Sequence, residues 1–301
     1  MSLNLKQVVQ TVATFYENLE TNMIRIVADT TSTLTIDDAK KLSIYLLPQI
    51  IIFGETEYRD DNEITSEEFL SKLKSSSSLP KTAAPSPALY TPIFQEILSA
   101  DDSVLVLCPS AKVSGTFRSA TIAAQDFQDA KINVIDTGII GPALGWIVRF
   151  ALSLAKTNAS TDEIISQVIK KSQSLKIYFY VDTLEYLYKG GRIGGAKALV
   201  GSVLQIKPIL LFKDGQVNPF ESQRSKKKAF ARIIELVKAE CPTSAESYLS
   251  LFQADAIQDA LFFKEELTKI IGVSEIPISN LPPAIVVHAG PGVVAVSFFT
   301  N

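Results

Sequence analysis

Short apolar runs alternate with helix-like segments along the first half of the chain, and this alternation restricts the fold more than any other feature. The runs MIRIVAD (23–29), DSVLVLC (102–108) and INVIDT (132–137) are typical of buried strands. Segments between and after them, such as GPALGWIVRFALSLAK (141–156), carry apolar residues at helical spacing. Strands that alternate with helices form parallel sheets with helices on both faces. The pattern therefore predicts a doubly wound α/β domain.

The pattern changes near residue 174. KIYFYVD (176–182) is typical of a strand, the segment 184–206 of two helices interrupted by glycines, and Asp214-Gly215 of a hairpin turn. We expect the segment 283–299 to form two strands around a Gly-Pro-Gly turn. The predicted fold class is α/β with two domains. Residues 1–173 form an N-terminal parallel-sheet domain with an additional N-terminal helix, and residues 174–301 form a C-terminal α+β domain.

Three further segments of the first domain carry local predictions. Thr65, with Glu68 three residues later, predicts a capping box that opens a helix. The segment IYLLPQIIIF (44–53) reads as one apolar run, whereas the Ser- and Pro-rich segment around KTAAPSP (81–87) reads as a loop.

Composition excludes several classes of protein. With 47% hydrophobic and 20% charged residues the chain is globular, and its net charge of -3 gives no general attraction to nucleic acid. The longest apolar stretches contain Pro48 or the pair Lys207-Pro208 and are shorter than the roughly 20 residues of a spanning helix, so we expect no membrane-embedded segment. Two cysteines cannot build a disulfide framework, which favours the cytoplasm, and a single histidine excludes multi-histidine metal sites.

Small polar residues follow the second strand-like run, in PSAKVSGTFRSA (109–120). Ser114 and Gly115 lie at the predicted start of a helix. A hydroxyl at this place caps free backbone N–H groups, helps to bind an anion at the helix N-terminus, or acts as a nucleophile. This motif alone leaves the three readings open.

Five other polar residues are candidates for the same site. Asp29 and Thr30 end the first strand-like run, where α/β proteins place ligand contacts. Thr82 lies in a segment whose simpler interpretation is a solvated linker. Arg224 precedes three lysines, and its planar guanidinium suits a carboxylate or phosphate. His288, the only histidine, precedes a glycine turn and is equally compatible with a core position and a ligand contact.

The ordered set of motifs resembles the DegV family from about Ile24 to Phe299. It comprises Asp-Thr-Thr after a strand, a TxxPS loop, SGTFRSA, LEYLYKGGRIGG, IKPIL, an R-x-KKKA basic start and HAGPG. The resemblance implies a two-domain protein that binds a long-chain fatty acid non-covalently between its domains. It also implies a partner, the ATP-binding subunit of a bacterial fatty acid kinase, which phosphorylates the carboxylate. The chain itself is then a carrier without catalytic activity or cofactor.

The resemblance also implies a set of site residues. The family's carboxylate-binding threonine and serine correspond to Thr82 and Ser114, and its arginine and histidine correspond to Arg224 and His288. Supporting residues at the motif positions are Asp29, Thr30, Ser86, Gly115 and Thr116. The chain departs from the family where Ala83 replaces a serine and where a helix precedes Ile24. We further expect Arg192 to face the partner kinase.

The chemistry of a fatty acid fits these residues. Two hydroxyls, a guanidinium and an imidazole bind the head group, and burial of the tail contributes about 0.8 kcal/mol per CH₂, on the order of 10 kcal/mol for about C14–C18. Such a tail needs an apolar tunnel, for which the runs at 44–53 and 199–212 are candidate walls. The prediction allows transient contact with a membrane surface.

Two other functions stay open at this point. In a serine hydrolase, Ser114 is the nucleophile, His288 the base and Asp29 or Asp136 the orienting acid, although Ser114 lacks the G-x-S-x-G elbow. In a sugar- or phosphate-sensing module the same residues bind an anion that has no alkyl tail. LEYLYKGGRIGG is not a G-x-G-x-x-G motif, and no glycine-lysine phosphate loop is present in the sequence, so we expect no bound nucleotide.

Overall fold

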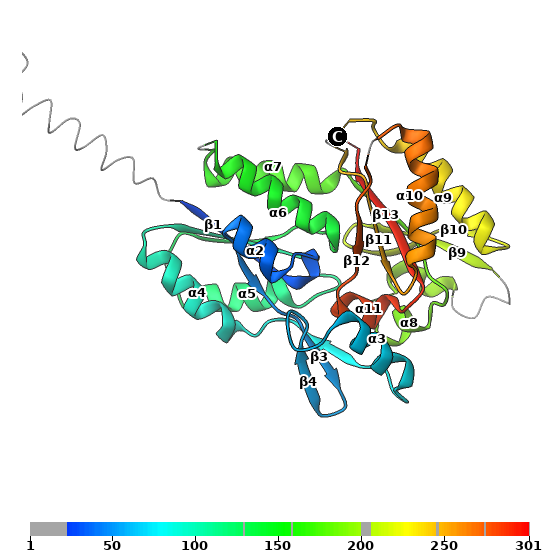
Figure 1. Ribbon diagram of the computed structural model, residues 1–301. Coiled ribbons are helices and arrows are strands. Elements are labelled where there is room, and N and C mark those ends of the chain that lie inside the picture. Colours follow the sequence, from blue (N-terminus) through cyan, green and yellow to red (C-terminus); the bar gives the residue numbers. More distant parts are fainter. Residues whose placement is uncertain are drawn as a thin grey trace, which may run out of the picture.

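The computed structural model describes residues 23–128, 130–157, 159–199, 206–244, 247–273 and 275–300. The helix predicted before Ile24 lies outside these residues. The described chain forms an N-terminal domain around a parallel sheet and a separate C-terminal domain of sheet and helices (Figure 1). The fold class predicted from the sequence is therefore confirmed, whereas a boundary between residues 173 and 174 stays a prediction.

The N-terminal domain is built on four parallel strands in the order β2-β1-β6-β7. Their bounds are β1 (Ile24–Asp29), β2 (Tyr45–Leu47), β6 (Ser103–Cys108) and β7 (Ile132–Asp136). All six residues of β6 are buried, as its unbroken apolar run requires of a strand covered on both faces. The strands predicted at 23–29, 102–108 and 132–137 are confirmed.

Helices cover both faces of this sheet (Figure 1). Alternate strand residues pack in two clusters, with Ile26 and Leu105 in the first and Val27 and Val106 in the second. The first cluster includes α6 (Pro142–Ala155) and α7 (Thr161–Gln173), and the second α4 (Pro87–Ser99) and α5 (Thr116–Ala124). The short helix α2 (Ile36–Leu42) joins β1 to β2. The core therefore consists of two apolar layers, one on each face of the sheet.

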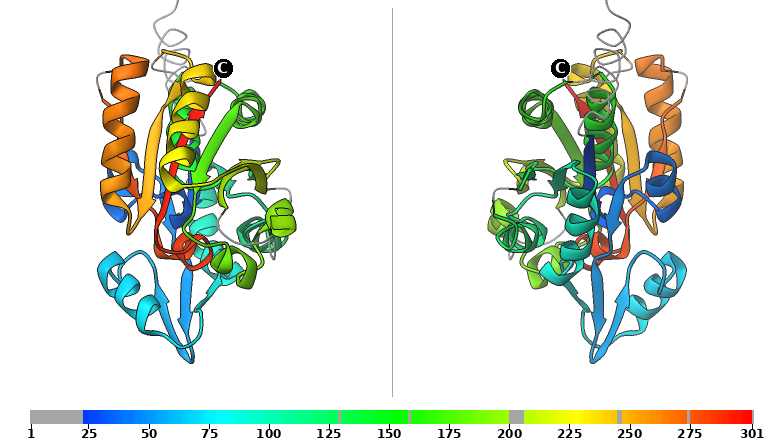
Figure 2. Two further views of the ribbon diagram at one scale, coloured as in Figure 1. Left: turned by 90° about the vertical axis from the view of Figure 1, so that its right-hand side faces the viewer. Right: turned by 90° about the vertical axis from the view of Figure 1, so that its left-hand side faces the viewer.

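A small antiparallel sheet with strand order β4-β3-β5 projects at one end of the molecule (Figure 2). It consists of β3 (Ile50–Phe53), β4 (Thr56–Arg59) and β5 (Lys81–Ala83). The helix α3 (Ser66–Ser75) lies between β4 and β5 in the chain. The capping box of Thr65 and Glu68 is confirmed at the start of α3. Ile51 and Phe69 pack in the same cluster as residues of the C-terminal domain. This sheet therefore connects the two domains.

The apolar run 44–53 is divided between β2 and β3 at Pro48-Gln49, because proline lacks the N–H that a ladder requires. One prediction in this region is wrong. The predicted loop at 81–87 begins with a strand, in which Thr82 pairs with Ile51. The extended conformation of β5 comes from its pairing with β3, which the local composition did not indicate.

The C-terminal domain has a six-stranded sheet in the order β10-β9-β8-β13-β11-β12. Its strands are β8 (Leu175–Tyr180), β9 (Lys207–Lys213), β10 (Gln216–Gln223), β11 (Ser250–Ala254), β12 (Ile278–Asn280) and β13 (Val293–Phe299). All neighbours are antiparallel except β11 and β12. Asp214 and Gly215 form the turn between β9 and β10, so the predicted hairpin is confirmed.

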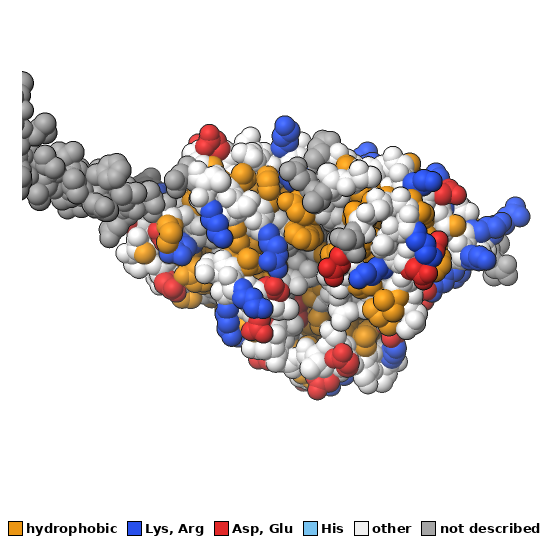
Figure 3. All heavy atoms as spheres, turned by 45° about the horizontal axis from the view of Figure 1, so that its top comes forward, with side chains coloured by type: hydrophobic (Ala, Val, Ile, Leu, Met, Phe, Trp, Pro, Cys, Tyr) orange, Lys and Arg blue, Asp and Glu red, His pale blue; other side chains and the backbone are white. Residues whose placement is uncertain are grey.

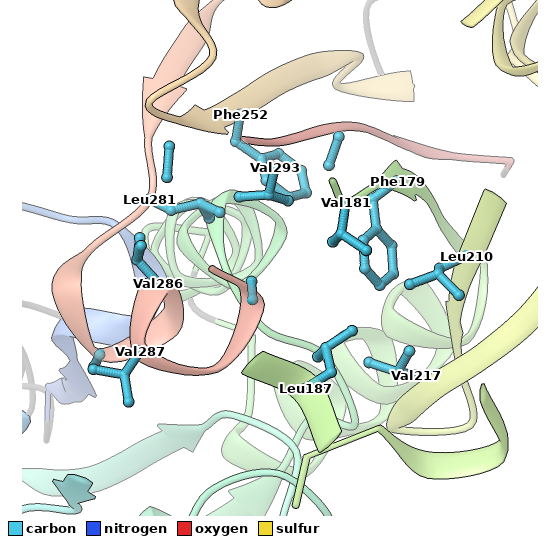
Figure 4. Packing of buried hydrophobic residues seen from close by; sticks show 14 of the residues in the cluster. Phe179, Val181, Leu187, Leu210, Val217, Phe252, Leu281, Val286, Val287 and Val293 are labelled. Atoms are coloured by element: carbon cyan, nitrogen blue, oxygen red, sulfur yellow. The ribbon is translucent and has the colours of Figure 1, made fainter. Parts of the chain in front are cut away.

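The two faces of this sheet have different surroundings. Tyr178 and Tyr180 of β8 pack with α9 (Lys226–Glu240) and α10 (Ile257–Ile271). Ile177 and Phe179 point to the opposite face, where α8 (Glu185–Lys189) and α11 (Pro283–Ala289) lie (Figure 4). Only this second face is directed to the N-terminal domain and contributes to the site described below.

The segment 283–299 differs from its prediction. Pro283–Ala289 is the helix α11, not a strand, and only Val293–Phe299 is extended. A short apolar run fits a helix or a buried strand equally well by periodicity alone. Pro283 at the first helical turn and Gly290, with φ 81, at the end are compatible with a helix. His288 is consequently in the last turn of a helix.

The two helices predicted in 184–206 are only partly present. α8 (Glu185–Lys189) is followed by a 3₁₀ helix at Gly194–Leu199, and residues 200–205 lie outside the described structure.

Candidate functional site

A cavity lies between the two domains, and both contribute to its wall. The space open to the centre of a water molecule is about 120 Å³, whereas one water needs about 10–15 Å³. Most of the wall is apolar and comes from the C-terminal sheet and α11. Its polar side chains are Thr31, Gln49, Thr82, Ser114, Arg192 and His288. The cavity therefore combines a largely apolar lining with a small group of polar side chains, an arrangement that suits an amphipathic ligand.

Thr82 and His288 meet across the domain junction. The Oγ1 atom of Thr82 on β5 lies 2.9 Å from Nε2 of His288 on α11. Burial, followed by the nearby positive charge of Arg192, lowers the pKa of His288 to about 3. The imidazole is therefore neutral near pH 7. Its Nδ1 atom is buried and has no hydrogen-bond partner among the described residues.

Ser114 lies just before α5 and is held by Thr116. Its Oγ accepts a hydrogen bond from the Thr116 N–H at 3.3 Å and lies 3.0 Å from the Thr116 hydroxyl. That hydroxyl donates to Asp29 Oδ2 at 2.5 Å. The hydroxyl of Ser114 is thus positioned at the cavity wall by a residue that is itself fixed to a buried carboxyl group.

Asp29 is fully buried at the end of β1 and accepts hydrogen bonds at both oxygens. Its donors are the backbone and hydroxyl of Thr31, the hydroxyl of Thr116 and the amide of Gln49, the last at 2.6 Å. Burial raises the pKa of Asp29, and these hydrogen bonds oppose the increase. Asp29 is not among the described residues that line the cavity. It fixes Thr31 and Gln49, which do line the cavity, and Thr116, which contacts Ser114.

Asp60 is a second buried carboxyl group, close to Asp29. Asp60 Oδ1 accepts from the Thr30 hydroxyl at 2.7 Å and from the Gln49 N–H at 2.9 Å. Burial is the main cause that raises the pKa of Asp60 to about 7, and the charge of Asp29 contributes. Sequence reasoning missed Gln49 and Asp60; the only signal for Gln49 is a polar residue after Pro48 within an apolar run.

The arginine in the cavity wall is Arg192, not Arg224 as expected from the motifs. Arg224 is exposed between β10 and α9 and is not among the described residues that line the cavity. Arg192 lines it instead, half-buried, and donates to the carbonyl oxygens of Val113 at 3.3 Å and Gly190 at 2.8 Å. Burial lowers the pKa of the Arg192 guanidinium. Arg192 thus lines the cavity, and the expectation that it faces a partner kinase stays a prediction.

The glycine two residues before this arginine explains part of the LEYLYKGGRIGG motif. A Cβ atom on Gly190 would lie 2.4 Å from Nδ1 of His288 and 2.8 Å from the Tyr186 carbonyl oxygen. Gly190 therefore permits α8 and α11 to approach closely enough for Arg192 and His288 to share one cavity.

The remaining predicted residues divide into two groups. Gly115 lines the cavity, and Thr116 and Thr30 are buried behind it. Ser86 is exposed at the N-cap of α4 and makes no side-chain capping bond. The structure thus brings Thr82, Ser114, Gly115 and His288 together at one cavity and leaves Ser86 and Arg224 outside its wall.

The geometry gives no support to the hydrolase arrangement. His288 is hydrogen-bonded to Thr82 and Ser114 to Thr116, so the described structure does not pair a serine nucleophile with the histidine base. Asp29 is bonded to Thr31, Gln49 and Thr116, and Asp136 accepts from the backbone of Ala111 and Gly138. Neither carboxylate orients the imidazole.

Basic and acidic side chains are interspersed over the face shown in Figure 3, in keeping with the net charge of -3. Within the residues described, no three His, Cys, Asp or Glu side chains gather into a group that could hold a metal ion. In the same part of the chain, no helix has both the length and the apolar character needed to cross a membrane.

Comparison with known proteins defines the class to which this fold and cavity belong. Residues 23–301 match the family model described as "Uncharacterised protein, DegV family". A DegV domain-containing protein of Halalkalibacterium halodurans is 31% identical over 277 residues, which are 92% of this chain and 98% of the relative. The chain belongs to the DegV family.

Two solved structures of this family resemble the chain along nearly its whole length. The structure described as fatty acid binding of a DegV family protein from Thermus thermophilus has a TM-score of 0.84 and 30% identity, covering 93% of this chain and 100% of its own. DegV of Bacillus subtilis, described as a fatty acid binding protein, has a TM-score of 0.85 and 28% identity with the same coverage of both chains.

Proposed function

We propose that this protein binds one long-chain fatty acid non-covalently in the cavity between its domains. The carboxylate lies at the hydroxyls of Thr82 and Ser114, with neutral His288 and cationic Arg192 behind them. The tail lies along the apolar wall. The observation that carries the proposal is a single cavity with these polar groups in an otherwise apolar lining. The fatty-acid-binding relatives at 28–30% identity support it.

The energetics of such a ligand agree with the lining. Hydrogen bonds to a charged group contribute about 1.5–3 kcal/mol each, and each buried CH₂ contributes about 0.8 kcal/mol. The tail of an acid of about C14–C18 therefore supplies the larger favourable contribution, which the costs of association reduce. The head group determines the orientation of the acid, and the guanidinium of Arg192 balances its charge in the low-dielectric cavity.

We further propose that the protein is a carrier subunit without catalytic activity of its own. It presents the carboxylate to a separate ATP-binding kinase subunit in the cytoplasm of a bacterium. There a carboxylate oxygen attacks the γ-phosphorus of ATP, ADP leaves, and an acyl phosphate forms. Support comes from the ordered motifs that resemble the fatty-acid-binding subunit of that kinase. The lack of a glycine-lysine phosphate loop in the sequence agrees with ATP being bound elsewhere.

The head-group assignment is tested by the affinity for palmitate. We expect Ser114→Ala and Thr82→Ala each to weaken binding by about tenfold or more, because each removes a hydrogen bond to a charged group. Ser86→Ala is the matched control, since Ser86 is an exposed hydroxyl of the same region outside the cavity wall. If Ser114→Ala and Thr82→Ala bind palmitate as tightly as Ser86→Ala and the wild type do, the assignment is contradicted.

The kinase partnership and the rival chemistry need separate assays. Hydroxylamine trapping should detect acyl phosphate only when the loaded protein, ATP and a fatty acid kinase subunit are all present. Labelling of Ser114 by a fluorophosphonate, lost in His288→Ala, would instead identify a serine nucleophile.

A further inference from the structure

A single alanine separates two phenylalanines in the cavity wall. Ala295 of β13 pairs directly with Phe252 of β11 on one side and with Phe179 of β8 on the other. All three residues line the cavity. Adjacent strands lie about 4.8 Å apart, so the backbones of the two phenylalanines are separated by about 10 Å with only a methyl group between them.

The side chains of this row point to the same face of the sheet. Phe179, Phe252 and Ala295 belong to one apolar cluster, and the alternate residue Val296 belongs to the cluster on the other face. Figure 4 shows Phe179 and Phe252 directed to the side of the sheet where Leu187 of α8 lies. In a filled core, neighbouring side chains occupy the volume above such an alanine. Here that volume is part of the cavity.

The position of Ala295 along the strand separates it from the head group. β13 begins at Val293, a few residues after His288, and Val293 also lines the cavity on the same face. Ala295 lies two residues, about 7 Å, further along the strand. The next row carries Ile177 and Phe212, which pair with each other and also line the cavity. The wall therefore runs from His288 along β13 toward Ile177 and Phe212.

We propose that Ala295 determines which acyl chains the cavity accepts. Its methyl group is the floor of a channel between Phe179 and Phe252, through which the chain passes to reach the row of Ile177 and Phe212. A larger side chain at position 295 closes this channel and leaves room only for shorter acids. The inference rests on the proposed function, because it assigns a role to the wall of the same cavity.

The test compares the chain lengths that the variants accept. In Ala295→Val and Ala295→Leu we expect the affinity for palmitate to fall by at least about tenfold, because several CH₂ groups lose their burial. The affinity for decanoate should change by less than about threefold. Ala254→Val is the matched control: Ala254 is a buried alanine of the same apolar cluster, on the neighbouring strand β11, and it is not among the residues that line the cavity. It should leave the preference for palmitate over decanoate unchanged.

A second variant keeps the test informative if the leucine variant does not fold. Phe179→Leu shortens one side of the channel, and combined with Ala295→Val it should restore the affinity for palmitate at least in part. Wild-type protein that binds no fatty acid would contradict the proposed function. Wild-type protein that binds palmitate, with Ala295→Val and Ala295→Leu unchanged in chain-length preference, would overturn this inference alone.

Discussion

Asp60 is an unusual carboxyl group because it is buried beside another. One oxygen accepts from Thr30 and Gln49, and the other is buried without a hydrogen-bond partner among the described residues. Its pKa is raised from 3.8 to about 7. A carboxyl whose folded pKa exceeds its unfolded value binds more protons in the folded state. Stability from this group is therefore present at low pH and is lost as the pH rises through the folded pKa.

Replacement of Asp60 by asparagine isolates this contribution. Asp60→Asn retains the acceptor for Thr30 and Gln49 and cannot ionise. We expect the unfolding free energy of the wild type minus that of Asp60→Asn to fall by up to about 1.4 kcal/mol per pH unit between about pH 4 and pH 7. Denaturant titrations at several pH values measure it, and a difference that does not vary with pH would show that Asp60 ionises normally.

The two arginines permit a direct comparison. Arg192 lines the cavity beside His288, and Arg224 is exposed and lies outside the cavity wall. We expect Arg192→Met to weaken palmitate binding by about tenfold or more, since the ligand carboxylate loses its compensating charge, and Arg224→Met to have little effect. Isothermal titration measures both affinities. A larger loss in Arg224→Met would restore the assignment made from the sequence.

At the scale of elements, the contact of α8 with α11 positions the polar end of the cavity. In Gly190→Ala the new methyl group would meet Nδ1 of His288 and the Tyr186 carbonyl, so His288 must move away from Thr82. We expect weaker palmitate binding together with a lower unfolding free energy.

Gly191 provides the control for Gly190→Ala. Gly191 has φ +69 and open space around the position of a Cβ, so Gly191→Ala introduces backbone strain of about 1 kcal/mol without a collision. It should lower stability and leave affinity unchanged. If the two variants bind palmitate equally, the close approach of α8 and α11 has no role in the site.

The elements differ in how far their sequences predicted them. β6 is a continuous apolar run and α7 has a capping box and periodic apolar residues, so local sequence and tertiary environment agree. α11 was expected as a strand because a short, largely apolar run of seven residues does not distinguish the two conformations. β5 is extended only because β3 pairs with it.

The residues of the site likewise divide into those that the sequence predicted and those that it did not. Thr82, Ser114 and His288 were predicted from motifs that resemble those of a family, and the structure brings all three to one cavity. Arg192, Gln49 and Thr31 were not assigned to it. Their place depends on how the glycine-rich segment and the end of β1 pack against other elements, which the spacing of residues in the chain does not specify.

For the whole molecule, the site exists only when the two domains are held together. Thr82 and Ser114 come from the N-terminal domain, and Arg192 and His288 come from the C-terminal domain. On the same junction, the Ser110 hydroxyl donates to the carbonyl oxygen of Gly215 at 2.7 Å, and Trp146 stacks on Tyr248 with ring centroids 4.6 Å apart. The ligand proposed here therefore contacts both domains and should stabilise their association.

Native mass spectrometry of the freshly purified protein tests the central claim most directly. We predict one bound molecule per chain that is released on denaturation and whose mass is that of a fatty acid of about C14–C18. Protein that is consistently empty, and that takes up neither added palmitate nor added oleate, would contradict the account.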